Sequence, residues 1–183
     1  MEENSSLTTR RLHLRFFTLA DAPTVQRLCG EREIALNTAN IPHPYEDGMA
    51  EEWITRHLQE IEEGKLLNFA ITLRDDNSLI GAICLVIKRE DGIAELGYWI
   101  GKPWWSLGYA TEAAQALMGH GFRELDLGRI YAQCFSRNPA SARVLQKAGM
   151  VREGCLRKHF NKWGEFVDIE IYGLLREEYP GNP

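Results

Sequence analysis

Several features that mark secreted, membrane or zinc-binding proteins are missing from the sequence. The four cysteines lie far apart, with no Cys-x-x-Cys pair and no histidine at ligand spacing, so we expect buried free thiols in a reducing compartment and no metal site. No apolar run is long enough to span a membrane, and residues 1–6 are too acidic and polar for a signal peptide. We therefore expect a cytoplasmic protein without a membrane partner.

Basic clusters and the common nucleotide and hydrolase motifs are also missing. The formal net charge is −5, and the lysines and arginines form no dense run, which argues against nucleic acid as a partner. The chain has no Gly-x-x-x-x-Gly-Lys-Ser/Thr loop, no Gly-x-Gly-x-x-Gly after a strand, no His-Glu-x-x-His and no Gly-x-Ser-x-Gly. These absences exclude the usual P-loop, dinucleotide, zinc-protease and serine-hydrolase sites.

What remains is a globular composition with a mixed α/β pattern. Of the 183 residues, 44% are hydrophobic and 26% charged, enough for one domain with a substantial core. Alternating apolar residues predict a strand over 10–17, and strands over 67–73, 79–87 and 93–100 are joined by short polar turns, as in an antiparallel meander. Residues 80–87 are apolar at both odd and even positions, which face opposite sides of a strand, so helices should cover both faces of the sheet.

In the N-terminal third, capping and periodicity signals predict two helices. Asp21 is placed to cap a helix over 22–29. Residues 31–45 are expected to be irregular, and an amphipathic helix over about 47–63 should end at Gly64.

The C-terminal half continues the alternation of helix and strand. Apolar spacing predicts a helix over 110–125, and the strand that follows at 130–135 indicates a crossover connection. Residues 138–149 read as a helix that begins with Asn-Pro and ends with Gly. The segments 150–160 and 166–174 are expected to form a hairpin.

The segment 95–113 is the most informative part of the chain. It reads as a buried strand, a tight loop with Gly108, and the first turn of a helix. The unpaired N–H groups of Leu107 to Thr111 would then point toward one spot that suits a phosphate, and Gly108 would allow close approach of a diphosphate. The alternative is that Gly108 only makes a tight turn.

Four motifs, two of them within this segment, occur in order along the chain and together indicate a family resemblance. They are Arg11-Leu12-His13-Leu14-Arg15 with Asp21, then Leu96-Gly97-Tyr98-Trp99-Ile100, then Trp104-Trp105-Ser106-Leu107-Gly108-Tyr109-Ala110-Thr111-Glu112-Ala113, and Asn138-Pro139-Ala140-Ser141 leading to Val144-Leu145-Gln146-Lys147-Ala148-Gly149-Met150. From about residue 9 to residue 175 the chain resembles the GNAT N-acetyltransferases, in the branch of the ribosomal-protein N-terminal alanine and serine acetyltransferases. Trp105 stands where the superfamily often has Arg or Gln, and Ala110 replaces the second glycine.

The resemblance implies a fold class and an architecture. The expected fold is mixed α/β (α+β), one domain over residues 1–183, with a mostly antiparallel twisted sheet and helices on both faces. The central strand pair should splay, with the strand that ends near Ile100 leaving the strand that ends near Phe135. The pantetheine arm of the coenzyme would lie between them.

The resemblance also implies a set of residues that bind acetyl-coenzyme A as co-substrate. Main-chain N–H groups near Trp99 would polarise the thioester carbonyl. Asn138 would bind the pantetheine amide, a role compatible with capping its helix. The full expected set is Trp99, Ile100, Trp105, Ser106, Leu107, Gly108, Tyr109, Ala110, Thr111, Asn138 and Ser141.

Two residues are candidates for catalysis. Glu95 lies mid-strand among apolar neighbours, where an unpaired carboxylate is costly, and it could deprotonate the attacking amine directly or through water. The alternatives are a partner for an arginine or an exposed edge position. Ser141 resembles the hydroxyl that lies near the coenzyme sulfur in this branch; alternatively, it only bonds the backbone of its helix.

The expected activity is transfer of an acetyl group from acetyl-coenzyme A to a primary amine by direct attack in a ternary complex. The acceptor is either a protein N-terminus or a small amine, and the protein a monomer or homodimer. A coenzyme A-binding sensor or scaffold without turnover is the alternative. Residues 34–45 and 160–166 should flank the acceptor, with five lining candidates that could instead be core residues: His43, Tyr45, Trp53, Asn161 and Trp163.

Overall fold

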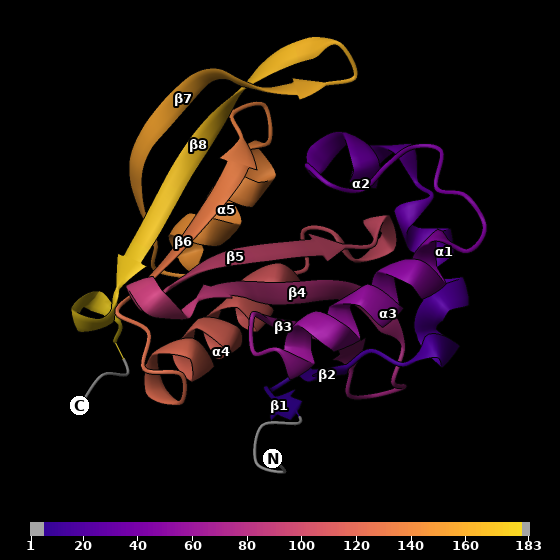
Figure 1. Ribbon diagram of the computed structural model, residues 1–183, viewed down its shortest axis with the longest axis horizontal. Coiled ribbons are helices and arrows are strands. Elements are labelled where there is room, and N and C mark those ends of the chain that lie inside the picture. The colour runs from indigo at the N-terminus through magenta and orange to yellow at the C-terminus, as the bar shows by residue number, and fades with distance from the viewer. Residues whose placement is uncertain (1–5, 181–183) are drawn as a thin grey trace.

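The computed structural model describes residues 6–180 and is built around one eight-stranded sheet (Figure 1). The strand order is β1-β2-β3-β4-β5-β6-β8-β7. Within residues 6–180 every neighbouring pair is antiparallel except β5 and β6, which run parallel. The bounds are β1 (Ser6–Thr8), β2 (Leu12–Phe16), β3 (Leu66–Leu73), β4 (Leu79–Lys88), β5 (Ile93–Ile100), β6 (Arg129–Phe135), β7 (Val151–Lys162) and β8 (Glu165–Leu175). Residues 1–5 and 181–183 of the expected domain lie outside the described residues.

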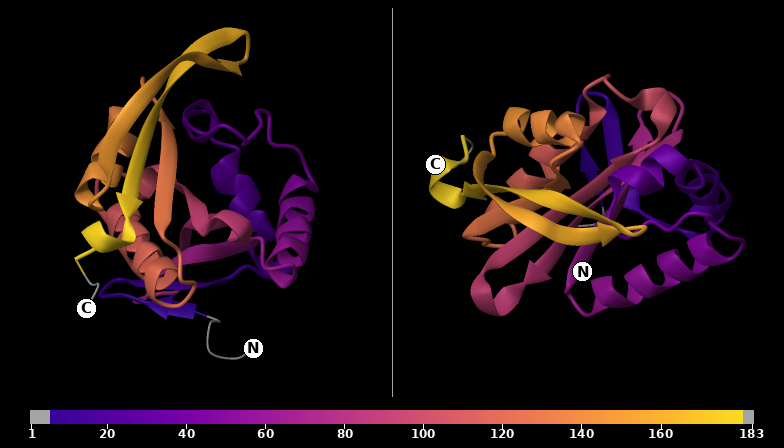
Figure 2. Two further views of the ribbon diagram at one scale, coloured as in Figure 1. Left: turned by 60° about the vertical axis from the view of Figure 1, so that its left-hand side comes forward. Right: turned by 90° about the horizontal axis from the view of Figure 1, so that it is seen from above.

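Helices cover both faces of the sheet, as expected (Figure 2). The helices are α1 (Ala22–Cys29), α2 (Arg32–Asn37), α3 (Met49–Glu62), α4 (Tyr109–Arg123) and α5 (Pro139–Lys147). Successive strand residues face opposite ways, so Ile71 packs with the α4 and α5 side while Ala70 packs with the α1 and α3 side. No helix among residues 6–180 combines the length and apolarity needed to cross a bilayer.

The expected cap of α1 is wrong. Asp21 directly precedes the helix, but its side chain makes no capping hydrogen bond to it. The carboxylate instead accepts two hydrogen bonds of 2.8 Å from the guanidinium of Arg15 and one of 2.9 Å from the backbone N–H of Thr18. A charged donor in the preceding strand therefore outcompetes the helix N-terminus for this carboxylate.

The expectation that residues 31–45 are irregular is also wrong in part. Residues 32–37 form the short helix α2, which buries Ile34 and Ala35. Two buried residues in six give too little periodicity for a sequence pattern to reveal the helix. The rest of this segment, from Thr38 onward, has no helix or strand before α3 begins.

The parallel pair β5–β6 separates partway along its length. Four residue pairs join the strands, from Ile93–Arg129 to Leu96–Ala132. Beyond Leu96, β5 continues beside β4 to Ile100, while β6 continues beside β8 to Phe135. Figure 1 shows β6, β7 and β8 turning away from β3, β4 and β5. The predicted splay of the central strand pair is therefore confirmed.

Candidate active site

The loop between β5 and α4 forms one wall of the site. It contains a short 3-10 turn (Lys102–Trp104) and two residues in the left-handed region, Ser106 at φ +62° and Gly108 at φ +82°. Gly108 is the residue that precedes the first turn of α4, and as a glycine it has no side chain to cap that turn. The free N–H groups and the helix dipole make this corner suited to an anion such as a diphosphate.

An arginine that directly precedes β2 holds this loop in place. The Arg11 guanidinium donates to the Leu107 carbonyl at 2.9 Å and to the Glu112 carboxylate at 2.7 Å, and lies 4.4 Å from the Tyr109 ring centre. Glu112 also accepts from the hydroxyl of Thr9 at 2.6 Å. Burial works against ionisation of Glu112, but these hydrogen bonds outweigh it and lower its pKa. Sequence reasoning found Arg11 as part of a motif but gave it no role.

The other predicted residues of this segment follow the strand, loop and helix in order. Trp105 folds back so that its indole N–H donates to the Ile100 carbonyl at 2.6 Å. This hydrogen bond occupies the single donor of the Trp105 side chain. The Ile100 side chain is buried in the core, whereas Ser106 and Leu107 are exposed. Ala110 and Thr111 occupy the first turn of α4. In this segment the contacts available to a ligand are therefore mainly those of the backbone.

A pair of hydroxyl groups lies across the gap where β5 and β6 separate. The hydroxyl oxygen of Tyr98 is 2.7 Å from that of Ser141, at the start of α5. Burial raises the pKa of Tyr98 well above its ordinary value, so this hydroxyl stays protonated. Asn138 accepts a hydrogen bond from the Ser141 backbone N–H at 3.1 Å and therefore caps α5. Tyr98 was not among the predicted site residues, although its motif was noted.

Glu95 lies on β5 just before the strands separate. Its carboxylate accepts a hydrogen bond of 3.2 Å from the Tyr131 hydroxyl on β6, directly opposite it in the sheet. Within residues 6–180 no arginine or lysine forms an ion pair with it. The side chain is half-buried and faces a cavity, so the two alternatives of a salt-bridge partner and an exposed edge position do not describe it.

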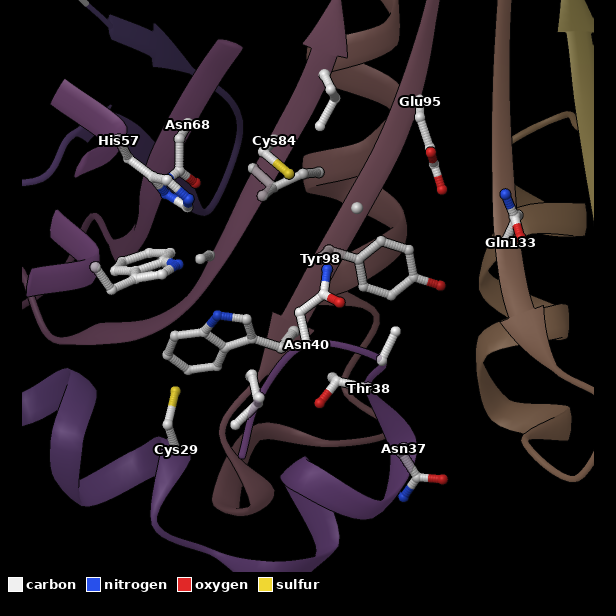
Figure 3. Close-up of a pocket in the computed structure, with 18 of the residues that line it drawn as sticks. Cys29, Asn37, Thr38, Asn40, His57, Asn68, Cys84, Glu95, Tyr98 and Gln133 are labelled. Atoms are coloured by element: carbon white, nitrogen blue, oxygen red, sulfur yellow. The ribbon is translucent and has the colours of Figure 1, made fainter. Parts of the chain in front are cut away.

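The cavity reaches both faces of β5. Its volume is about 740 Å³. Glu95, Gly97 and Trp99 line it from one face of the strand, and Tyr98, from the other face, lines it with Ser141. Figure 3 shows Glu95, Tyr98 and Gln133 around the gap, with Cys84 on β4 and the paired side chains of His57 and Asn68 farther from Gln133. Because β6 has left β5 at this level, the cavity passes through the sheet.

The outer wall of the cavity comes from residues 37–45 and the β7–β8 hairpin. Of the five predicted acceptor residues, Tyr45 and Trp53 line the cavity, whereas His43, Asn161 and Trp163 do not. The Asn161 side chain instead accepts from the backbone of Gly164 in the hairpin turn. His43 and Trp163 lie near one another, with ring centres 6.1 Å apart. Segment positions were thus predicted better than the side chains that face inward.

A strand pair that splays beside an anion-binding loop and helix is the arrangement of acyl-coenzyme A N-acyltransferases. Residues 11–151 match the family described as "Acetyltransferase (GNAT) domain". This chain therefore belongs to the GNAT acetyltransferases and is an acyl-coenzyme A N-acyltransferase, as the sequence motifs indicated. Its fold is the mixed α/β fold of that family.

Individual relatives agree with this assignment. The chain is 32% identical over 178 residues to the "Uncharacterized N-acetyltransferase p20" of Bacillus licheniformis, covering 96% of this chain and 99% of the relative. It is 31% identical over 140 residues to the "Putative ribosomal N-acetyltransferase YdaF" of Bacillus subtilis, covering 75% and 72%. The latter match supports the ribosomal-protein acetyltransferase branch.

A solved structure shares the fold over nearly its whole length. It is the ribosomal L7/L12 alpha-N-protein acetyltransferase RimL in complex with coenzyme A, with a TM-score of 0.87 and 19% sequence identity. The match covers 93% of this chain and 98% of that chain. At this identity the likeness shows the fold.

Proposed function

We propose that the protein transfers the acetyl group of acetyl-coenzyme A to a primary amine by direct attack within a ternary complex. The observation that carries this proposal is the cavity that passes through the sheet beside β5. Glu95 lines it on one face, and the hydroxyl pair of Tyr98 and Ser141 lies on the other. An amine and a thioester that enter from opposite faces would meet beside groups that can accept and supply a proton.

The residues present fit the coenzyme. Ser106 and Gly108 adopt left-handed backbone conformations just before α4, which leaves first-turn amides free for a diphosphate. The gap between β5 and β6 offers main-chain groups of residues 97–100 to the pantetheine arm and to the thioester carbonyl oxygen. Bound there, the coenzyme supplies an acetyl group on sulfur, which is an activated acyl donor. Of the remaining predicted contacts, Ser141 lines the cavity, and Asn138 accepts a hydrogen bond from the Ser141 backbone N–H.

The catalytic roles follow from which side each group occupies. Glu95 takes the proton that the amine gives up, directly or through one water molecule. As the new C–N bond forms and the C–S bond breaks, the hydroxyl pair of Tyr98 and Ser141 supplies a proton to the departing sulfur. Glu95 then releases its proton to water, and the hydroxyl pair regains one from water. A neutral amide and a free thiol result, so protons balance.

A covalent acyl-cysteine route has less support. Cys134 lines the cavity, but burial, together with the nearby negative charge of Glu170, raises its pKa to about 11. A thiol with such a pKa carries little thiolate near neutral pH, and the thiolate is the nucleophile. Direct attack is therefore the route that we propose.

The test is a coenzyme-release assay with acetyl-coenzyme A and a panel of primary amines and short peptides. Glu95→Gln should lower kcat by about a hundredfold or more while coenzyme affinity, measured by calorimetry, stays within twofold. Glu153→Gln is the matched control, because Glu153 is a strand glutamate paired with Arg129 outside the cavity. Coenzyme binding without amine-dependent release for any acceptor would instead support the sensor or scaffold alternative.

A further inference from the structure

The residues of β5 that line the cavity, which form its floor, are polar at one end of the strand and aromatic at the other. Glu95, Gly97 and Trp99 share one face of the strand, and at about 3.3 Å per residue the two ends lie about 13 Å apart. Cys84 lies opposite Gly97, and Ala82 lies opposite Trp99, on β4. These small residues leave room between a polar end at Glu95 and an aromatic end at Trp99.

The aromatic end forms a lobe of apolar side chains. We define the aromatic lobe as the cavity-lining residues Cys29, Ile41, Tyr45, Met49, Trp53 and Trp99. Four of them pack, half-buried, against the cluster formed by α1, α3, β3 and β4, and Cys29 is buried within it. Burial raises the pKa of Tyr45 to about 12, so its hydroxyl is uncharged.

Charged residues lie around the aromatic lobe rather than in it. Glu52 and Arg56 of α3 also line the cavity, but both are exposed and they carry opposite charges. Glu95 lies at the other end of the floor, and Glu60 is one helical turn farther along α3 than Arg56. An ammonium group placed deep in the aromatic lobe would therefore lose water without gaining a paired carboxylate.

One buried lysine holds the outer wall of the aromatic lobe. The Lys162 side chain is 5% exposed and comes from the end of β7. Its ammonium donates to three carbonyl oxygens of the wall segment, those of Thr38 at 2.7 Å and of Ala39 and Ile41 at 3.4 Å. An ammonium has three donors, and these contacts use them all. The hairpin thus fixes the segment that carries Ile41 over the cavity.

We propose that the acceptor is a primary amine with an apolar substituent, aliphatic or aromatic, that binds in the aromatic lobe, and that Lys162 is the positioning residue for the wall of this lobe. This inference rests on the proposed function, because it assigns a substrate class to the same site. The substituent can belong to a free amine or to the first residue of a peptide. In both cases it would exchange water for the faces of Trp53 and Trp99.

The first test compares acceptors of equal size. Hexylamine and 1,5-diaminopentane have the same number of heavy atoms but end in a methyl and an ammonium group. We expect kcat/KM to rise about fourfold per methylene from butylamine to hexylamine, and hexylamine to exceed the diamine at least tenfold. In the peptide arm, peptides that begin with Leu or Phe should exceed those that begin with Ser or Asp.

The outcomes separate this inference from the proposed function. A diamine or a Ser peptide that matches or exceeds its apolar counterpart would overturn the inference while amine acetylation stands. Absence of coenzyme release with every acceptor, while coenzyme still binds, would overturn the proposed function, and the inference with it.

The second test is a set of variants. Lys162→Met keeps the side-chain length but removes the donors, and it should raise the KM for the best apolar amine about tenfold while the KM for acetyl-coenzyme A stays within twofold. Lys158→Met, on the same strand and exposed, should change neither KM. If Lys162→Met does not fold, Ile41→Ala serves instead and should reduce the preference for hexylamine over butylamine. Equal effects on both substrates, or an unchanged preference in Ile41→Ala, would contradict the proposal.

Discussion

Replacing Arg11 with methionine should weaken coenzyme binding, although we assign the residue no direct contact with the coenzyme. The guanidinium links the start of β2 to the loop through the Leu107 carbonyl and to α4 through Glu112. It also lies over the ring of Tyr109. Without it, the loop amides next to Gly108 lose the contacts that hold them in position before the ligand arrives, so binding must order them.

The size of the effect follows from the exposure of the groups. The Arg11 and Glu112 side chains are 34% and 19% exposed, so their ion pair contributes at most about 1 kcal/mol after solvent screening. The hydrogen bond to the Leu107 carbonyl and the stacking on Tyr109 add about 1 kcal/mol together. A loss of about 1–2 kcal/mol corresponds to a decrease of roughly 5–30-fold in coenzyme affinity.

A second arginine, Arg15 on β2, provides the control. Arg15 pairs with Asp21 through two contacts of 2.8 Å, and the side chains are 31% and 10% exposed. Arg15→Met should therefore destabilise the fold by about as much as Arg11→Met does. Each kcal/mol lost corresponds to a decrease of about 2–4 °C in melting temperature. Arg15→Met should leave coenzyme affinity unchanged, because neither partner touches the loop.

The measurements are titration calorimetry with coenzyme A and thermal melting of both variants. Equal losses of coenzyme affinity in Arg11→Met and Arg15→Met would refute the reasoning, since the effect would then be one of general stability. An Arg11→Met variant that binds coenzyme as the parent does would refute it as well. Glu112→Gln should reproduce part of the Arg11→Met effect, and the double variant should fall short of the sum.

Three further predictions concern the gap, the sheet and acid stability. Tyr98→Phe and Ser141→Ala should each lower kcat about tenfold, and the double variant should be no worse than either, as steady-state kinetics would show. Gly81→Ala should lower the melting temperature by several degrees, because an added Cβ would overlap the Trp99 carbonyl oxygen on β5. Burial opposes ionisation of Asp21, but its hydrogen bonds outweigh burial and lower its pKa below the ordinary value of 3.8. The stability that the ionised carboxylate contributes is therefore present above about pH 4 and is lost as the pH falls further. In Asp21→Asn the melting temperature should consequently depend less on pH in this acid range.

The sheet and its strand pairing could be predicted because their signals are local. The polar turns between β3, β4 and β5 fix an antiparallel meander, and the long periodic helix α4 requires a crossover to β6. The splay needed the resemblance, because nothing in the residues of β5 or β6 alone shows where their pairing ends.

The site was predicted unevenly for physical reasons. The loop at Gly108 has a backbone signature that a sequence can carry, whereas the contacts of Arg11 and Lys162 join segments about 100 residues apart. Of the hydroxyl pair, Ser141 was among the predicted site residues and Tyr98 was not. Asp21 shows the opposite failure: a local capping rule predicted its partner, and a charged group from the strand took its place.

The short pairing of β5 with β6, over four residue pairs, has a consequence for motion. At the level of these four pairs, one core cluster joins residues from both halves of the sheet. Toward the far end of the outer arm, formed by β6, β7 and β8, a separate small cluster packs around Phe135, Val167 and Ile169. The arm is therefore joined to β5 only as far as the Leu96–Ala132 pair, and the Lys162 ammonium holds its far end to the Thr38 carbonyl. Amide hydrogen exchange should be faster in the arm than in β4, and a molecule that bridges the two halves should slow it.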